Sequence, residues 1–215
     1  MASARSILLM PVMSEIWKEF GGASNLIGWR FRACHEDMTR YIKSWETYGA
    51  NVSFEEMYLQ ERALFGMFSA GVSCIESTCY ALHALASHPK LLDLPFGESE
   101  QRSCSPARVK ERLSKYPSAL ALTDTLTVLT GSTEWALWVD LRNRMTHRSN
   151  LPRIVEFAGG SEPPPTKALY FAATSSTPAF QADVSHLEVM FTWLAQSLRN
   201  LLIEGQVFAS LPKTL

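Results

Sequence analysis

Three side chains in the stretch from Asp140 to Arg148 have the types and spacing that phosphodiester cleavage in RNA requires. Arg142 and Asn143 are adjacent, and His147 follows four residues after the asparagine. On a helix, positions 143 and 147 lie one turn apart, and position 142 is about 100° around the axis. Arginine offers a permanently charged fork that fits phosphate, and histidine takes or gives a proton near neutral pH. Such a set can activate a 2′-hydroxyl and stabilise charge on phosphorus without a metal ion or other cofactor.

An arginine followed by a nearby histidine is by itself a weak signal, because the pair also occurs at Arg30 and His35. An asparagine directly after the arginine makes the pattern much rarer, and Phe31 stands at that place in the second match. The alternative for 142–147 is an ordinary solvated helix end, since arginine and histidine interact favourably with the dipole at a helix C-terminus. The residues alone leave both interpretations open.

Three further arginines, Arg144, Arg148 and Arg153, are candidates for holding RNA phosphates. From 141 to 155 the chain has four arginines, one histidine and no acidic residue, although the whole chain has 20 Lys+Arg against 21 Asp+Glu, a net charge of −1. Near-neutrality excludes a histone-like polycation. It leaves room for one small basic site, where the expected partner is RNA.

Glu76 is the single formal charge between Arg62 and Lys90. A carboxylate in so apolar a helix must be paired, hydrogen-bonded or protonated. One hypothesis makes it a positioning residue that orients Arg142 or His147. The alternatives are exposure in a groove or an ion pair with another arginine.

The elements expected to position these residues are mostly helices. Apolar periodicity, caps and breakers predict helices over 24–48, 53–86, 106–116, 118–129 and 133–148, and a last helix after Asp183. Two strands at 153–157 and 168–172, joined by the Gly/Pro-rich 159–165, predict a β-hairpin. The predicted fold is all-α, an up-and-down bundle of about four main helices. It forms one domain over 1–215, with its core at about 24–203 and a hairpin insertion at 153–173 before the last helix.

Composition places the chain among globular proteins, since 47% of its residues are apolar. The apolar helix at 62–90 is not expected to cross a membrane, because Ser69, Ser73, Glu76 and His83 lie along it. The apolar run at 7–10 is too short for a typical signal segment, so the expected location is the cytoplasm. The four cysteines are expected to be reduced, buried thiols: Cys34, Cys74, Cys79 and Cys104.

Two other features favour structural roles. Trp135 and Trp138 could stack on bases, but their spacing beside Leu141 favours a core or dimer-interface position. The run at 35–37, His-Glu-Asp, is not a metal site, because neighbouring helix positions point in different directions.

A helical bundle with Leu141-Arg142-Asn143 and His147 near the end of a late helix resembles the HEPN superfamily. That family's signature is an arginine, a polar residue, then three to five residues and a histidine. The resemblance implies an RNase or RNA-binding protein of a toxin–antitoxin, antiviral or stress system. It makes Arg142 the phosphate ligand, Asn143 an orienting residue and His147 the general acid and base.

Catalytic members of the family usually dimerise and place two motifs in one shared cleft without metal. The resemblance therefore implies a homodimer and a possible antitoxin or regulator as partner. Two departures are the longer chain and the hairpin at 153–173, which lies where it could block such a cleft. Many family members lack demonstrated activity, so the alternative is a non-catalytic bundle that binds RNA or protein.

Overall fold

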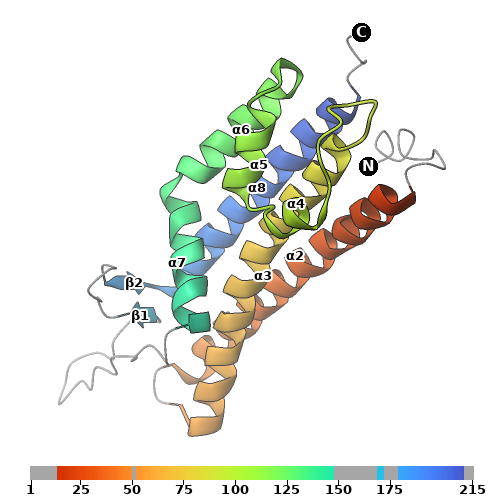
Figure 1. The fold of residues 1–215 in the computed structure, drawn as a ribbon. Coiled ribbons are helices and arrows are strands. Elements are labelled where there is room, and N and C mark those ends of the chain that lie inside the picture. Colours follow the sequence, from red (N-terminus) through yellow and green to blue (C-terminus); the bar gives the residue numbers. More distant parts are fainter. Residues whose placement is uncertain (1–13, 50–51, 148–168, 172–178, 211–215) are drawn as a thin grey trace.

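A computed structural model describes residues 14–49, 52–147, 169–171 and 179–210 of the chain (Figure 1). This part is an all-α helical bundle, which confirms the predicted fold class. Its helices are α2 (Ser14–Tyr48), α3 (Phe54–Ala86), α4 (Glu98–Arg102), α5 (Pro106–Leu113), α6 (Leu120–Gly131), α7 (Thr133–His147) and α8 (Val184–Ala209). A 3₁₀ turn, η2 (Pro117–Ala119), precedes α6, and two short strands, β1 (Leu169–Phe171) and β2 (Phe180–Ala182), precede α8.

The two longest helices, α2 and α3, lie side by side (Figure 1). Gly49 ends α2 with a φ of 62°, and its N–H donates to the Trp45 carbonyl at 2.7 Å. Glycine adopts this left-handed conformation without a Cβ clash. Ser53 then caps α3, because its hydroxyl accepts a hydrogen bond from the Glu56 N–H at 3.2 Å. The predicted start of this helix is confirmed.

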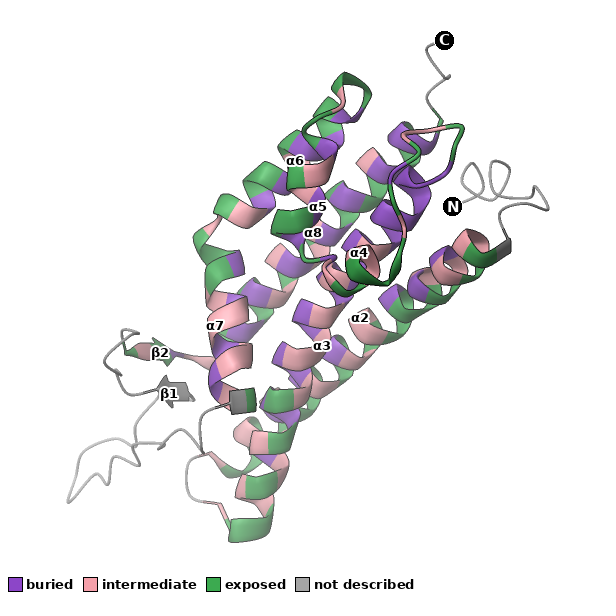
Figure 2. Ribbon diagram, in the orientation of Figure 1, coloured by how far each residue is buried: buried purple, intermediate pink, exposed green. Residues whose placement is uncertain are grey.

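Helix α3 is the central helix of the bundle, in contact with α2, α5, α7 and α8. Of its 33 residues, 18 are buried (Figure 2). This surrounding by other helices explains why its sequence is apolar nearly all round. None of the helices in the described residues has the length and apolar character needed to span a bilayer.

Helix α2 begins ten residues earlier than predicted, at Ser14 rather than at residue 24. The pair Gly21-Gly22 weakens the local helix signal. The first ten residues of α2 nevertheless pack against the core through Ile16, Trp17 and Phe20. Tertiary packing therefore stabilises a helix that local propensity does not favour.

The structure confirms one strand of the predicted hairpin and shows a further strand after it. β1 falls within the predicted strand 168–172, but it pairs antiparallel with β2, with Tyr170 opposite Gln181. The sheet thus continues beyond the predicted end at residue 173. Strand β2 was missed because three residues are too few for a recognisable alternating pattern. The other predicted strand, 153–157, lies outside the described residues.

Helices α5 to α8 begin close to the predicted positions, whereas the five-residue α4 lies in a segment for which no helix was predicted. Ser105 caps α5, and Ser132 separates α6 from α7. One hydrophobic core includes buried residues from Phe20 to Ala209. Trp135 and Trp138 belong to this core, which confirms the core interpretation of both indoles. All four cysteines are free thiols buried in the bundle.

Candidate functional site

The last two turns of α7 carry the predicted catalytic motif. Arg142 and Asn143 are half-buried, and the helix continues to His147, so positions 143 and 147 are one helical turn apart. The side chain of His147 and residues Arg148 and Arg153 lie outside the described part of the chain. The structure therefore gives the helical frame of the motif and the surroundings of its arginine.

Close packing of α7 against α3 brings the helix that carries the motif beside the central helix of the bundle. Trp138 is fully buried, and its ring meets the Phe68 ring edge-on at a centroid distance of 5.3 Å. Its indole also lies against Gly71, where an added Cβ would overlap the ring. A glycine at position 71 is therefore needed for α7 to approach α3 this closely.

Glu76 on α3 faces Arg142 on α7. The distance from Arg142 Nη2 to Glu76 Oε1 is 3.6 Å, and the side chains are 27% and 39% exposed. This is an ion pair that is too long for a good hydrogen bond. Glu76 thus lies beside Arg142, where the positioning hypothesis requires it.

The loose pairing leaves the Arg142 guanidinium able to bind another anion. Its Nε is buried, and within the described residues it has no hydrogen-bond partner. A guanidinium has five N–H donors in a fixed fork, which suits bidentate contact with phosphate oxygens. Arg142 is accordingly a partly exposed, partly neutralised cation beside a carboxylate.

Arg144 is not a surface phosphate ligand, contrary to the expectation from sequence. It is only 1% exposed, and its Nε lies 2.7 Å from Asp140 Oδ2, one turn earlier on α7. A step of two residues along a helix corresponds to a rotation of about 200° around its axis. Arg144 therefore points away from the side of Arg142, toward the buried face of α7. Burial and the close carboxylate make this arginine part of the structural core of the bundle.

Glu76 also lines a groove of about 740 Å³ that the sequence analysis did not predict. We call it the α2–α3 groove. It is bounded by α2, by α3, and by the segment from α4 to the N-cap of α5. Its lining includes Trp29, Arg30, Glu76, Ser77, Tyr80 and Gln101. The sequence signal that could have indicated it is the run of polar residues at helical spacing on α3 (Ser73, Glu76, Ser77, Tyr80).

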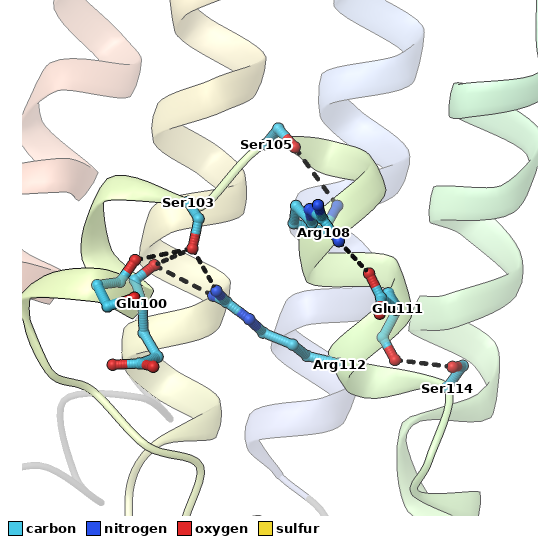
Figure 3. A network of polar contacts seen from close by, with 8 residues as sticks. Glu100, Ser103, Ser105, Arg108, Glu111, Arg112 and Ser114 are labelled. Carbon is cyan, nitrogen blue, oxygen red and sulfur yellow. Dashed lines mark hydrogen bonds and ion pairs between the residues drawn. The ribbon is translucent and has the colours of Figure 1, made fainter.

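Arg112 on α5 holds the third wall of this groove in place (Figure 3). Its Nη2 donates to the Ser103 hydroxyl at 2.6 Å, and its Nη1 donates to the Glu100 carbonyl at 3.2 Å. The same Nη1 lies 3.3 Å from Nε2 of His83 on α3. These contacts tie the segment around α4 to α5 and to the central helix.

The other charged feature weighed in the sequence does not converge on one point. Glu36 pairs with Arg32, and Asp37 pairs with Arg40, each at 2.6 Å. The exposed His35 instead has its ring 5.1 Å from that of Phe191. The three side chains therefore have three different partners, as their neighbouring positions on one helix lead us to expect.

Comparison of the chain with protein-family models, with curated proteins and with solved structures gives no match. The interpretation of the site therefore depends on its own residues and geometry.

Proposed function

We propose that this protein is a metal-independent endoribonuclease of the HEPN type, located in the cytoplasm, with its site at the C-terminal end of α7. The observation that carries the proposal is the partly exposed Arg142, 3.6 Å from Glu76 and on the same helix end as Asn143 and His147. A cation that is only loosely paired can exchange its carboxylate for a phosphate. His147, a side-chain type that commonly serves as general acid and base, follows five positions later.

In the proposed reaction, His147 removes the proton from a ribose 2′-hydroxyl, and the resulting oxygen attacks the adjacent phosphorus. The bond from phosphorus to the 5′-oxygen breaks, and that oxygen takes a proton from an imidazolium. Arg142 stabilises the extra negative charge on the phosphoryl oxygens, and Asn143 orients His147 or the substrate. The products are a 2′,3′-cyclic phosphate and a 5′-hydroxyl.

A homodimer is part of the proposal, because two motifs in one cleft would supply a proton acceptor and a proton donor together. A toxin of a toxin–antitoxin, defence or stress system is the setting that this chemistry fits, with an antitoxin or regulator as partner. Arg148 and Arg153 remain candidates for holding additional phosphates.

The test is cleavage of varied single-stranded RNAs by the wild-type protein in excess EDTA, with the product ends identified by mass spectrometry. We expect cyclic phosphate ends, and a loss of at least about 100-fold in rate for His147→Ala and for Arg142→Ala. His35→Ala is the matched control, because it removes the histidine of the other arginine–histidine pair and is expected to leave the rate unchanged. Sedimentation velocity on the same samples checks for a species of two copies.

The rival proposal is a non-catalytic bundle that binds RNA or protein. It is supported instead if the wild-type protein binds RNA without cleaving it. If His147→Ala cleaves as fast as the wild type, the proposed role of His147 is contradicted. Cleavage that EDTA abolishes would contradict the metal-independent mechanism.

A further inference from the structure

The α2–α3 groove combines an exposed aromatic ring with a cation and hydrogen-bonding groups, beside Arg142. Trp29 is 70% exposed at this groove, and its neighbour Arg30 also lines it. The volume of about 740 Å³ lies within the usual range of about 300–1,000 Å³ for small-ligand sites. Since Glu76 lines the groove and faces Arg142, the groove adjoins the proposed cleavage site.

Two cations line the groove, and among the described residues Arg102 pairs with Glu98 whereas Arg30 has no carboxylate partner. Tyr80 donates to Glu19 at 2.7 Å, and Glu76 faces Arg142. Burial, together with this bond to Glu19, raises the pKa of Tyr80, so the hydroxyl remains a donor. Both carboxylates of the groove therefore have a partner other than Arg30, and the bond from the neutral Tyr80 hydroxyl leaves the charge of Glu19 in place.

Arg30, in contrast, contacts neutral oxygens. Its Nη1 donates to the Ser73 carbonyl at 3.0 Å and to the Ser77 hydroxyl. No ion pair to Arg30 is found among the described residues. A half-buried guanidinium held only by neutral oxygens attracts an anion.

We infer that the α2–α3 groove binds one unpaired nucleotide of a single-stranded RNA, next to the phosphate held at Arg142. The base stacks on Trp29, and the phosphate binds Arg30. This inference rests on the proposed function and names a subsite for its substrate. Asn25 and Gln101, which also line the groove, offer amide groups that can bond base edges.

The combination of groups favours single-stranded RNA over a duplex. Stacking on a side chain requires a base that is free of its neighbours, as in loops and single strands. A groove of this volume holds one nucleotide rather than a helix of RNA. Ser77 connects the two arginines that are proposed to bind phosphate. Its hydroxyl accepts a hydrogen bond from Arg30, and it directly follows Glu76 on α3, the carboxylate that faces Arg142.

The test uses a short, fluorescein-labelled 2′-O-methyl RNA, which has no free 2′-hydroxyl and cannot be cleaved by this chemistry. Affinity is measured by fluorescence anisotropy at several salt concentrations. We expect Trp29→Ala to weaken binding about tenfold and Trp29→Phe to weaken it much less. Arg30→Gln should weaken binding and reduce the salt slope by about one, whereas Arg30→Lys should retain that slope.

Two matched controls lie away from the groove lining. Arg32→Gln removes a cation two residues further along α2, and Phe54→Ala removes an exposed ring at the start of α3. Both are expected to bind the probe as tightly as the wild type. Circular dichroism and sedimentation velocity confirm that every variant retains its fold and its oligomeric state.

Cleavage of unmodified RNA by the same proteins separates the two proposals. If wild type cleaves RNA but Trp29→Ala and Arg30→Gln bind the probe normally, the groove inference is overturned and the nuclease proposal survives. If wild type binds the probe through Trp29 and Arg30 but does not cleave RNA, the groove inference survives alone. If the wild-type protein neither binds the probe nor cleaves RNA, both proposals are overturned. If Trp29→Ala or Arg30→Gln changes the oligomeric state but not the affinity for the probe, the groove is a contact between proteins and the groove inference is overturned.

Discussion

Arg142 and Arg144 show how two residues of one type, two positions apart, acquire different roles. The guanidinium of Arg144 is buried and lies 2.7 Å from Asp140 Oδ2. That of Arg142 is partly exposed and lies 3.6 Å from Glu76. Helix geometry separates the two side chains by about 200°, so one faces the core and the other faces the edge of α3. Of the two guanidinium groups, only that of Arg142 is accessible to a bound anion.

At the residue scale, we predict that Glu76→Gln slows RNA cleavage while the bundle remains folded. The amide keeps the shape of the side chain but removes the charge that faces Arg142. Because both side chains are partly exposed, the free energy of unfolding should change by less than about 1 kcal/mol. Cleavage rate and thermal unfolding measured on the same sample check both parts.

Glu36→Gln is the control for this prediction, because it removes an exposed carboxylate that pairs with Arg32 on α2. It should leave the cleavage rate unchanged. A Glu76→Gln protein that cleaves at the wild-type rate would contradict a positioning role for this carboxylate.

At the scale of elements, the site depends on how closely α7 packs against α3. Contact between Trp138 and Gly71 sets this approach, and the ring of Phe68 supports the same indole. An apolar pattern shows that both helices have a buried face. It does not show which small residue on one helix accepts which large residue on the other, because that depends on helix crossing and register.

We predict that Gly71→Ala destabilises the protein by about 1–3 kcal/mol, since the new methyl group would overlap the Trp138 ring. Urea unfolding followed by circular dichroism measures the change. Gly28→Ala on α2 is the matched control, because no heavy atom lies within 4 Å of a Cβ placed there. That substitution should stabilise the helix by up to about 1 kcal/mol. Equal effects of the two substitutions would show that helix propensity, not packing, governs position 71.

At the scale of the whole molecule, Arg112 on α5 holds the segment around α4 against the bundle. It donates to the Glu100 carbonyl on α4 (Figure 3) and contacts His83 on α3. His83 takes part as a neutral, fully buried acceptor. Burial, together with the nearby charge of Arg112, lowers the pKa of His83 from 6.5 to about 4. The folded state therefore favours the uncharged imidazole.

This pKa predicts a loss of stability in mild acid. The stabilisation from neutral His83 is complete above about pH 6.5 and is lost as the pH falls through about 4, because the unfolded chain takes up the proton first. The free energy of unfolding in urea, measured from about pH 7.5 to pH 4.5, should fall more steeply for wild type than for His83→Gln. Parallel curves would mean that His83 titrates alike in the folded and unfolded chains.

Periodicity and capping residues in the sequence determined most of the helices and the all-α class. Ser53, Ser105 and Ser132 mark helix boundaries through local hydrogen bonds, and such bonds need no distant partner. The early start of α2 was missed because it depends on packing against residues far along the chain. The strand β2 was missed because three residues are too few to show an alternating pattern.

The sequence by itself also determined which residue types stand near one another on α7, and hence the chemistry that is possible there. Only the tertiary structure decided that Arg144 is buried, that Glu76 faces Arg142, and that Trp29 and Arg30 line a groove beside them. The physical reason is that spacing within a helix fixes directions around one axis. Pairing between helices depends on how their surfaces pack, which no single segment contains.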